Sequence, residues 1–142
     1  MIKNFLAFGA NPGLVNKNRQ NLIHLACSKG FIKLVVFYKL NFDLHIEEKD
    51  INGLTPAHLA AREEKEALIA LLISWNINLN STDSKSNTLL HYAAKNDSVR
   101  ICKMLIIRGA KRSEKNIDNK TPFELAASLH NTKTLRILVQ AK

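Results

Sequence analysis

Cysteine is scarce in this 142-residue sequence, which contains only Cys27 and Cys102. The two lie far apart along the chain, whereas small secreted domains that depend on disulfides usually carry several cysteine pairs. Because a free cysteine packs as a small hydrophobic residue, the sequence favours two reduced, buried thiols in a cytoplasmic protein.

A long hydrophobic run is also absent. The longest stretch without a charged residue, 67–82, contains Asn76, Asn78 and Asn80, and it is too short and too polar to span a bilayer. The first residues lack the apolar segment and the small-residue cleavage site of a secretory signal. We therefore expect no transmembrane segment in this chain.

Motifs of catalysis are missing as well. The sequence has no G-x-S-x-G, no H-E-x-x-H, no phosphate-binding P-loop and no GxGxxG. We expect no enzymatic activity from this chain alone, no cofactor and no metal. Acidic residues are also the minority, 12 against 21 basic ones, and the net charge of +9 suits an acidic protein, an anionic membrane or a nucleic acid as partner.

The sequence does contain a repeat. A seven-residue segment recurs four times, as N-L-I-H-L-A-C, T-P-A-H-L-A-A, T-L-L-H-Y-A-A and T-P-F-E-L-A-A. The fourth residues of these segments are separated by 34, 33 and 33 positions, and they are His24, His58, His91 and Glu124. A repeat at this period predicts a solenoid of stacked units.

A second pattern keeps the same period. Ten residues after each fourth position comes a largely apolar pair, and four residues later another apolar position, namely Tyr38, Leu72, Leu105 and Leu138. This spacing predicts one face of a second helix. Each segment predicts a first helix, with Thr55 as a typical N-cap and Pro56 at the first helical position. One such helix pair cannot bury its own apolar face, so stacking must supply the core.

This pattern resembles the ankyrin repeat, most closely in 50–80, where D-I-N-G-L-T-P-A-H-L-A-A precedes L-I-A-L-L-I and I-N-L-N. The resemblance covers essentially the whole chain. It implies one all-α ankyrin-repeat solenoid, 1–142, of helix-turn-helix units joined by hairpin loops. We expect full repeats at 16–49, 50–82, 83–115 and 116–142, and a partial repeat at 1–15. The chain then starts inside a repeat, as a piece of a longer protein would. A natural N-terminus with a degraded cap is the alternative.

Several residues depart from the ankyrin pattern. Arg19 stands where the hairpin glycine belongs, and Glu64 and Asp97 stand where a glycine normally separates the two helices. Asn21 and Leu22 replace the Thr-Pro pair, and one extra residue falls within 40–49. We expect these changes to affect the local shape of hairpins and turns and to leave the fold intact. The last helix, 132–141, mixes basic and apolar residues, as a terminal cap does.

The three repeated histidines raise the question of a metal site. Equivalent positions in a solenoid lie one repeat apart, so the imidazoles form a row and do not converge on one ion. The ankyrin resemblance implies a structural role instead, in which each imidazole bonds to backbone and ties neighbouring units together.

The resemblance also implies that partners bind at the hairpin tips and the adjoining ends of the first helices. Every unit has a basic residue at these positions, which favours a groove for an acidic or mixed peptide. The alternative is that a charge of +9 merely spreads lysines over every face. The site residues predicted on this basis are Lys17, Asn18, Lys29, Asn52, Leu54, Arg62, Lys85, Asn87, Lys95, Asn96 and Lys120. The same register places Ile51 and Ile117 at the tips.

Two other functions remain open at this point. Strings such as N-T-L-L-H-Y-A resemble the ankyrin domains of DHHC-type protein palmitoyltransferases, which implies a domain that recruits substrates for an enzyme whose catalytic part lies elsewhere. The third possibility is a basic surface that docks on an anionic membrane or a nucleic acid. Its densest cluster is Arg108, Lys111, Arg112, Lys115 and Lys120, but Glu114 and Asp118 interrupt it and no aromatic residues interleave for base stacking. We expect a monomer that binds a protein or peptide, with nucleic acid disfavoured.

Overall fold

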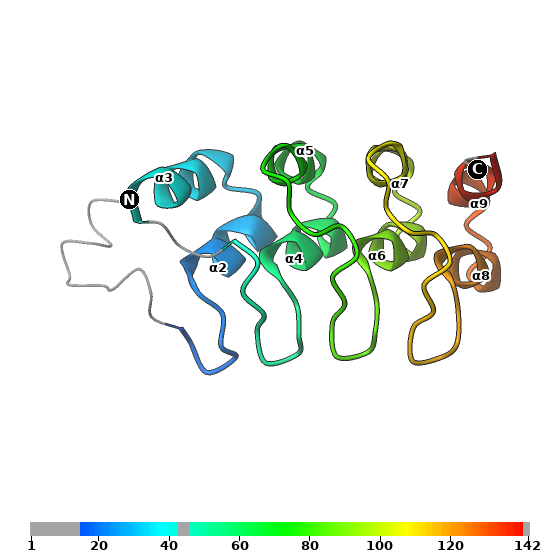
Figure 1. The fold of residues 1–142 in the computed structure, drawn as a ribbon, viewed down its shortest axis with the longest axis horizontal. Coiled ribbons are helices and arrows are strands. Elements are labelled where there is room, and N and C mark those ends of the chain that lie inside the picture. The colour runs from blue at the N-terminus through cyan, green and yellow to red at the C-terminus, as the bar shows by residue number, and fades with distance from the viewer. Residues whose placement is uncertain (1–14, 43–45, 141–142) are drawn as a thin grey trace.

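The computed structural model of the chain describes residues 15–42 and 46–140. The regular elements in this part of the chain are α-helices, arranged as successive antiparallel pairs along one axis (Figure 1). The all-α solenoid predicted from the repeat is therefore confirmed, while the partial repeat expected at 1–15 lies almost wholly outside the described residues. The helices are α2 (Leu22–Lys29), α3 (Ile32–Phe42), α4 (Pro56–Arg62), α5 (Glu66–Ser74), α6 (Leu89–Lys95), α7 (Val99–Ile107), α8 (Pro122–Ser128) and α9 (Thr132–Gln140).

The pairs form two rows. The first helices, α2, α4, α6 and α8, lie side by side in an inner row, and the second helices, α3, α5, α7 and α9, lie above them in an outer row (Figure 1). The loops that join successive pairs extend away from the inner row on the side opposite the outer row. The solenoid therefore offers two distinct surfaces, one made by loops and inner helices and one made by outer helices.

Each first helix begins at a capping box. The side chain of the N-cap residue accepts the backbone N–H of the third helical residue, and that residue's side chain accepts the N-cap N–H in return. Two backbone donors that would otherwise lack partners are satisfied in this way. The N-cap residues are Asn21, Thr55, Thr88 and Thr121.

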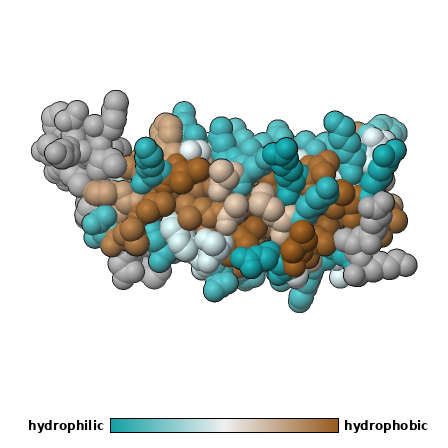
Figure 2. Space-filling view, turned by 90° about the horizontal axis from the view of Figure 1, so that it is seen from above, coloured by the Kyte–Doolittle hydropathy of each residue, from teal (hydrophilic) through white to brown (hydrophobic). Residues whose placement is uncertain are grey.

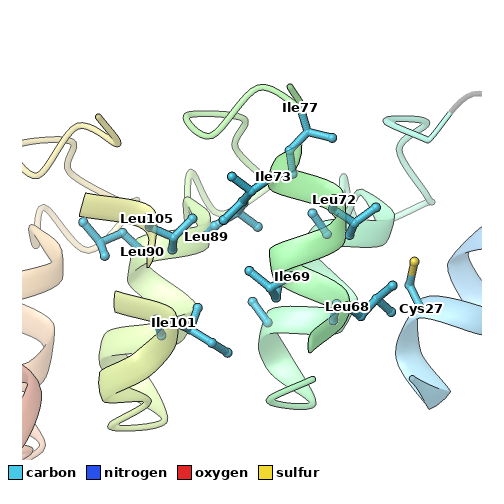
Figure 3. Close-up of a cluster of buried hydrophobic side chains, with 14 of the residues drawn as sticks. Cys27, Leu68, Ile69, Leu72, Ile73, Ile77, Leu89, Leu90, Ile101 and Leu105 are labelled. Carbon is cyan, nitrogen blue, oxygen red and sulfur yellow. The ribbon is translucent and has the colours of Figure 1, made fainter. Parts of the chain in front are cut away.

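Small side chains let the inner helices approach one another, and larger ones fill the space beneath the outer helices. Ala60 and Ala61 of α4, like Ala93 and Ala94 of α6, are fully buried. Leucine and isoleucine side chains from α5, α6 and α7 meet in a continuous core between neighbouring pairs, and Cys27 of α2 lies at its edge (Figure 3). The core therefore belongs to the stack and not to any single helix pair.

The turns between paired helices keep one backbone shape despite their different residues. Gly30, Glu64, Asp97 and His130 all have φ between 55° and 75°, the left-handed region. Both acidic residues of this set also form hydrogen bonds to the next unit. Glu64 Oε1 accepts the hydroxyl of Ser98 at 3.1 Å, and Asp97 Oδ1 accepts both the N–H and the hydroxyl of Thr134 at 3.0 Å. These contacts offset the conformational cost of a side chain at a position that favours glycine.

Candidate functional site

The loops between the helix pairs are hairpins, and each is organised by one polar side chain at its start. Asp50 Oδ1 accepts the backbone N–H groups of Asn52 and Leu54 at 2.9 and 2.8 Å. Asn or Asp makes the same pair of bonds in every unit, as Asn16, Asp50, Asp83 and Asn116. Each lies eight residues before the histidine or glutamate of its repeat, so the start of every hairpin has a periodic signal in the sequence.

We expect Asp50→Ala to destabilise the chain by about 2–3 kcal/mol, because two buried or half-buried N–H groups lose their acceptor. The second carboxylate oxygen also accepts the amide of Gln20 at 3.1 Å, and this bond is lost as well. Asp50→Asn is the matched control, since asparagine occupies the same position in the first and fourth units. Urea unfolding measures both variants, and equal losses for alanine and asparagine would contradict this role.

Successive hairpins are bonded to one another at their tips. The backbone N–H of Ile51 donates to Asn18 O at 2.8 Å, that of Ser84 to Asn52 O at 2.9 Å, and that of Ile117 to Lys85 O at 2.9 Å. These bonds join all four hairpins in one row, so the side chains at the tips are held at fixed spacing. A surface of this kind is pre-organised, which lowers the entropic cost of binding.

The three repeated histidines connect each inner helix to the next hairpin. Nε2 of His24 lies 3.0 Å from Leu54 O, that of His58 lies 3.1 Å from Asn87 O, and that of His91 lies 2.8 Å from Lys120 O. In each case Nδ1 accepts the N–H of the N-cap residue. The bridging role implied by the ankyrin resemblance is confirmed. Burial holds the pKa of each imidazole below 6.5.

Within residues 15–42 and 46–140, no three His, Cys, Asp or Glu side chains come close enough to hold a metal ion. Cys27 and Cys102 are free thiols with no exposed surface, as predicted. Burial raises the pKa of both thiols from 9.0 to about 12, and the charge of Asp97 adds to the effect at Cys102.

Both thiols should react slowly with a thiol reagent in the folded state. A pKa of about 12 leaves very little thiolate, the reactive form, at neutral pH. We expect labelling to be at least about a hundredfold slower in native buffer than in denaturant. Stopped-flow absorbance with a chromogenic disulfide checks this, and equally fast labelling in both conditions would show that the thiols are accessible.

Most of the predicted site residues lie on the hairpins and the ends of the inner helices with exposed side chains. These are Lys17, Asn18, Lys29, Asn52, Arg62, Lys85 and Lys95, and Lys120 is half-buried. Arg62 forms an ion pair with the neighbouring Glu63 at 3.2 Å, and both side chains stay nearly half exposed. The tips also carry exposed apolar side chains, with Ile51 at 57% and Ile117 at 68% exposure.

Three predicted site residues serve the stack instead. Leu54 is only 5% exposed, so its prediction as a surface residue is wrong. Its backbone N–H donates to Asp50 and its carbonyl accepts a hydrogen bond from His24, and both bonds hold this end of the hairpin against the helices. Asn96 donates its amide to the carbonyls of Ala61 and Arg62 at 3.3 and 3.0 Å. Asn87 Oδ1 accepts the amide of Asn116 at 2.9 Å.

The dense basic cluster also divides. Arg112 is half-buried and donates to Leu138 O at 3.0 Å, near the end of α9. Lys120 lies in the fourth hairpin, and its carbonyl accepts a hydrogen bond from Nε2 of His91. Arg108 is the C-cap residue of α7 and is exposed. Arg112 and Lys120 are therefore only partly available to a phosphate.

Tandem antiparallel helix pairs, joined by outward hairpins and held by capping boxes, define a class of helical repeat solenoids. The family model "Ankyrin repeats (3 copies)" matches residues 1–83, 33–117 and 75–142. The chain belongs to the ankyrin-repeat family, as the sequence pattern indicated.

Similar proteins differ widely in what surrounds these repeats. Palmitoyltransferase AKR1 of Lachancea kluyveri is 29% identical over 92% of this chain and 18% of that protein. Protein glp-1 of Caenorhabditis elegans is 30% identical over 92% of this chain and 11% of that protein. Tyrosine-protein kinase Shark of Drosophila melanogaster is 35% identical over 86% of this chain and 13% of that protein. The chain thus spans less than a fifth of the length of each of these three relatives.

In the part of the chain that the structure describes, no helix combines the length and apolar character needed to cross a bilayer.

Proposed function

We propose that this chain is a protein-interaction module that binds an acidic segment of a partner protein across its hairpin tips and inner-helix ends. The observation that carries this proposal is a row of basic side chains on the hairpins and inner-helix ends, exposed in the first three units and half-buried at Lys120 in the fourth, along hairpins that are bonded tip to tip. Protein binding is the general role of ankyrin repeats, and the acidic character of the partner is the specific part of the proposal.

Two acidic residues of the hairpins are bonded within the fold, whereas Asp118 is exposed. The carboxylate of Asp50 is bonded to two backbone N–H groups and to Gln20, and that of Asp83 is bonded to two backbone N–H groups and to the hydroxyl of Tyr92. Their partners are internal, so Lys17, Lys85 and Lys95 face solvent without an ion pair among the described residues. Such a surface attracts an anionic partner and fixes its register.

Exposed apolar side chains at the tips complement the charge. Ile51 and Ile117 are more than half exposed and lie in hairpins two units apart. An extended segment with acidic residues and occasional aliphatic ones therefore matches the surface, and the apolar contacts supply affinity that charge alone does not.

The proposal is tested by selecting peptides from a random displayed library against the folded chain. We expect the selected peptides to be enriched in Asp and Glu, and their affinity to fall about tenfold or more in Lys85→Glu/Lys95→Glu. The matched control is Lys33→Glu/Lys133→Glu, which makes the same change of net charge on the outer helices α3 and α9. Equal losses in both double variants, or peptides without acidic enrichment, would count against the hairpin surface.

A second function is favoured by the comparisons. Palmitoyltransferase AKR1 of Lachancea kluyveri matches 92% of this chain, and the protein of the same name from Candida glabrata matches 82% of it at 32% identity. We infer that the chain could equally serve as the substrate-recruiting ankyrin domain of such an enzyme. The test is the complete coding sequence of the parent protein. Hydrophobic spans and a cysteine-rich DHHC segment would support this function, and their absence would exclude it.

A further inference from the structure

The outer helices carry a groove that the hairpin surface does not use. Three adjoining cavities follow α5 and α7, with volumes of about 430, 280 and 300 Å³. The first and second share Met104, and the second and third share Ile73 and Arg108. The cavities therefore adjoin along the same pair of helices, and we call them together the α5–α7 groove. The helices that line it, α5 and α7, lie in the outer row, away from the hairpins (Figure 1).

The middle of the α5–α7 groove is apolar. Its walls are Ala70 and Ile73 from α5 and Met104 and Ile107 from α7. Ile107 is 80% exposed, the highest value among the exposed large hydrophobic side chains of the described residues. Figure 2, which looks onto the outer helices, shows apolar surface extending along the middle of this face between hydrophilic side chains. Contiguous apolar surface bordered by polar residues is typical of a docking site.

The border of the α5–α7 groove is basic. Arg100 and Lys103 line the cavity at one end, and Arg108 lines the two cavities at the other. The one acidic residue among the lining residues is Glu66, which lies 3.7 Å from Arg100, and that arginine side chain remains 81% exposed. An exposed ion pair of this kind is weak, so Arg100 remains available to another carboxylate.

The dimensions of the groove suit one short helix. α5 and α7 contain nine residues each, and a helix of that length extends about 13 Å. A partner helix of about nine to twelve residues could lie along them and place one aliphatic face, with residues at i, i+3, i+4 and i+7, into the apolar middle. Acidic residues on its flanks would then reach the basic side chains at both ends.

We propose that the α5–α7 groove binds an amphipathic α-helix of a partner protein that has an aliphatic face and acidic flanks. The groove supplies apolar burial through Ala70, Met104 and Ile107, and charge complementarity through Arg100, Lys103 and Arg108. This inference goes beyond the hairpin-mediated function, because it concerns the opposite side of the solenoid and a helical instead of an extended ligand. The chain can then hold two segments, of one partner or of two, at the same time.

The test uses the whole chain and a fluorescein-labelled synthetic peptide with leucines at i, i+3, i+4 and i+7 and glutamates at the flanking positions. Fluorescence anisotropy should give saturable binding. Arg100→Glu/Lys103→Glu should weaken it about tenfold or more, whereas Lys33→Glu/Lys133→Glu, with the same change of net charge on α3 and α9, should alter it by less than about twofold.

A second pair of variants tests the apolar part. Ala70→Glu places a bulky charge in the groove, whereas Ser74→Glu adds the same charge to an exposed position of the same helix outside the lining residues. Circular dichroism establishes that both are folded, which their exposed positions favour. Only Ala70→Glu should abolish peptide binding. The Lys85→Glu/Lys95→Glu variant should bind the helical peptide normally, so failure of the groove and failure of the hairpin surface can be told apart.

Three results would overturn the proposal. One is the absence of saturable peptide binding, and another is an equal loss in the Arg100/Lys103 and Lys33/Lys133 variants. The third is co-sedimentation with vesicles of phosphatidylcholine and phosphatidylserine that depends on Arg100 and Lys103 when the peptide does not bind. That result would assign the groove to an anionic membrane instead of a protein helix.

Discussion

Acidification from pH 7 to pH 5 is expected to lower the free energy of unfolding. His24, His58 and His91 are buried in a neutral state, because Nδ1 accepts a backbone N–H and Nε2–H donates to a carbonyl of the next unit. A protonated imidazole would place a second donor against that N–H. Burial keeps the pKa of all three below the value of 6.5 found in an unfolded chain.

The direction of the effect follows from which state binds protons. Below about pH 6.5 the unfolded chain takes up protons on these histidines while the folded chain does not, so stability is lost as the pH falls toward the folded-state pKa values. The maximum slope is about 1.4 kcal/mol per pH unit for each imidazole, and about 4 kcal/mol per unit for the three together.

Urea unfolding followed by circular dichroism at several pH values between 7.5 and 5 measures this slope. His58→Gln should lower the slope, whatever it does to stability at pH 7. The matched control is His130→Gln, which makes the same substitution at an exposed position. A stability that stays constant across this range, or an equal change in both variants, would mean that the buried histidines are not held neutral by the fold.

Replacement of Gly53 by alanine is expected to destabilise the chain by about 2–4 kcal/mol. Its φ is +77°, and an added Cβ would lie 2.6 Å from the backbone nitrogen of Ser84. That nitrogen donates to Asn52 O at 2.9 Å, so the methyl group would push apart two hairpins whose tips are bonded to each other. Because backbone atoms cannot move aside as a flexible side chain can, both the clash and the loss of the bond contribute.

Two matched variants separate the clash from the backbone conformation. Gly30→Ala has the same conformational problem, with φ +75°, but its methyl group meets only the flexible side chain of Lys65, so a loss of about 1 kcal/mol is expected. Ser86→Gly relieves a φ of 62° at the hairpin position equivalent to Gly53 and should stabilise by about 0.5–1 kcal/mol. Thermal and urea unfolding test this order, which would be contradicted if Gly53→Ala were as mild as Gly30→Ala.

The helices and their buried faces could be predicted from the sequence because they follow from a short periodic pattern. His58 marks the third residue of α4, and the apolar residues Leu68 and Leu72 mark the buried face of α5. Arg19, Glu64 and Asp97 were recognised as occupying glycine positions, and all three have positive φ. The repeat thus determines the local backbone even where individual residues depart from the family pattern.

The details of the surface were harder to predict, because they depend on bonds between units. Leu54 lies at a hairpin position and was expected to be exposed, but its backbone is bonded on both sides and its side chain is buried. The role of Asp50 in shaping the hairpin has a periodic signal that single residues do not reveal. The α5–α7 groove has no sequence motif at all, since it depends on how close Ala70 and Ile107 come when two units stack.

The chain therefore has two separate surfaces, and the proposed function depends on the hairpin surface. The most direct measurement is a titration of a selected acidic peptide into the ¹⁵N-labelled chain, followed by two-dimensional NMR. The largest shifts should fall on the backbone amides of Asn52, Lys85 and Lys95, with little change at Lys33 and Lys133. Shifts of equal size on the hairpins and on α3 and α9 would contradict a defined binding surface. They would indicate only nonspecific attraction of the acidic peptide to a positively charged protein.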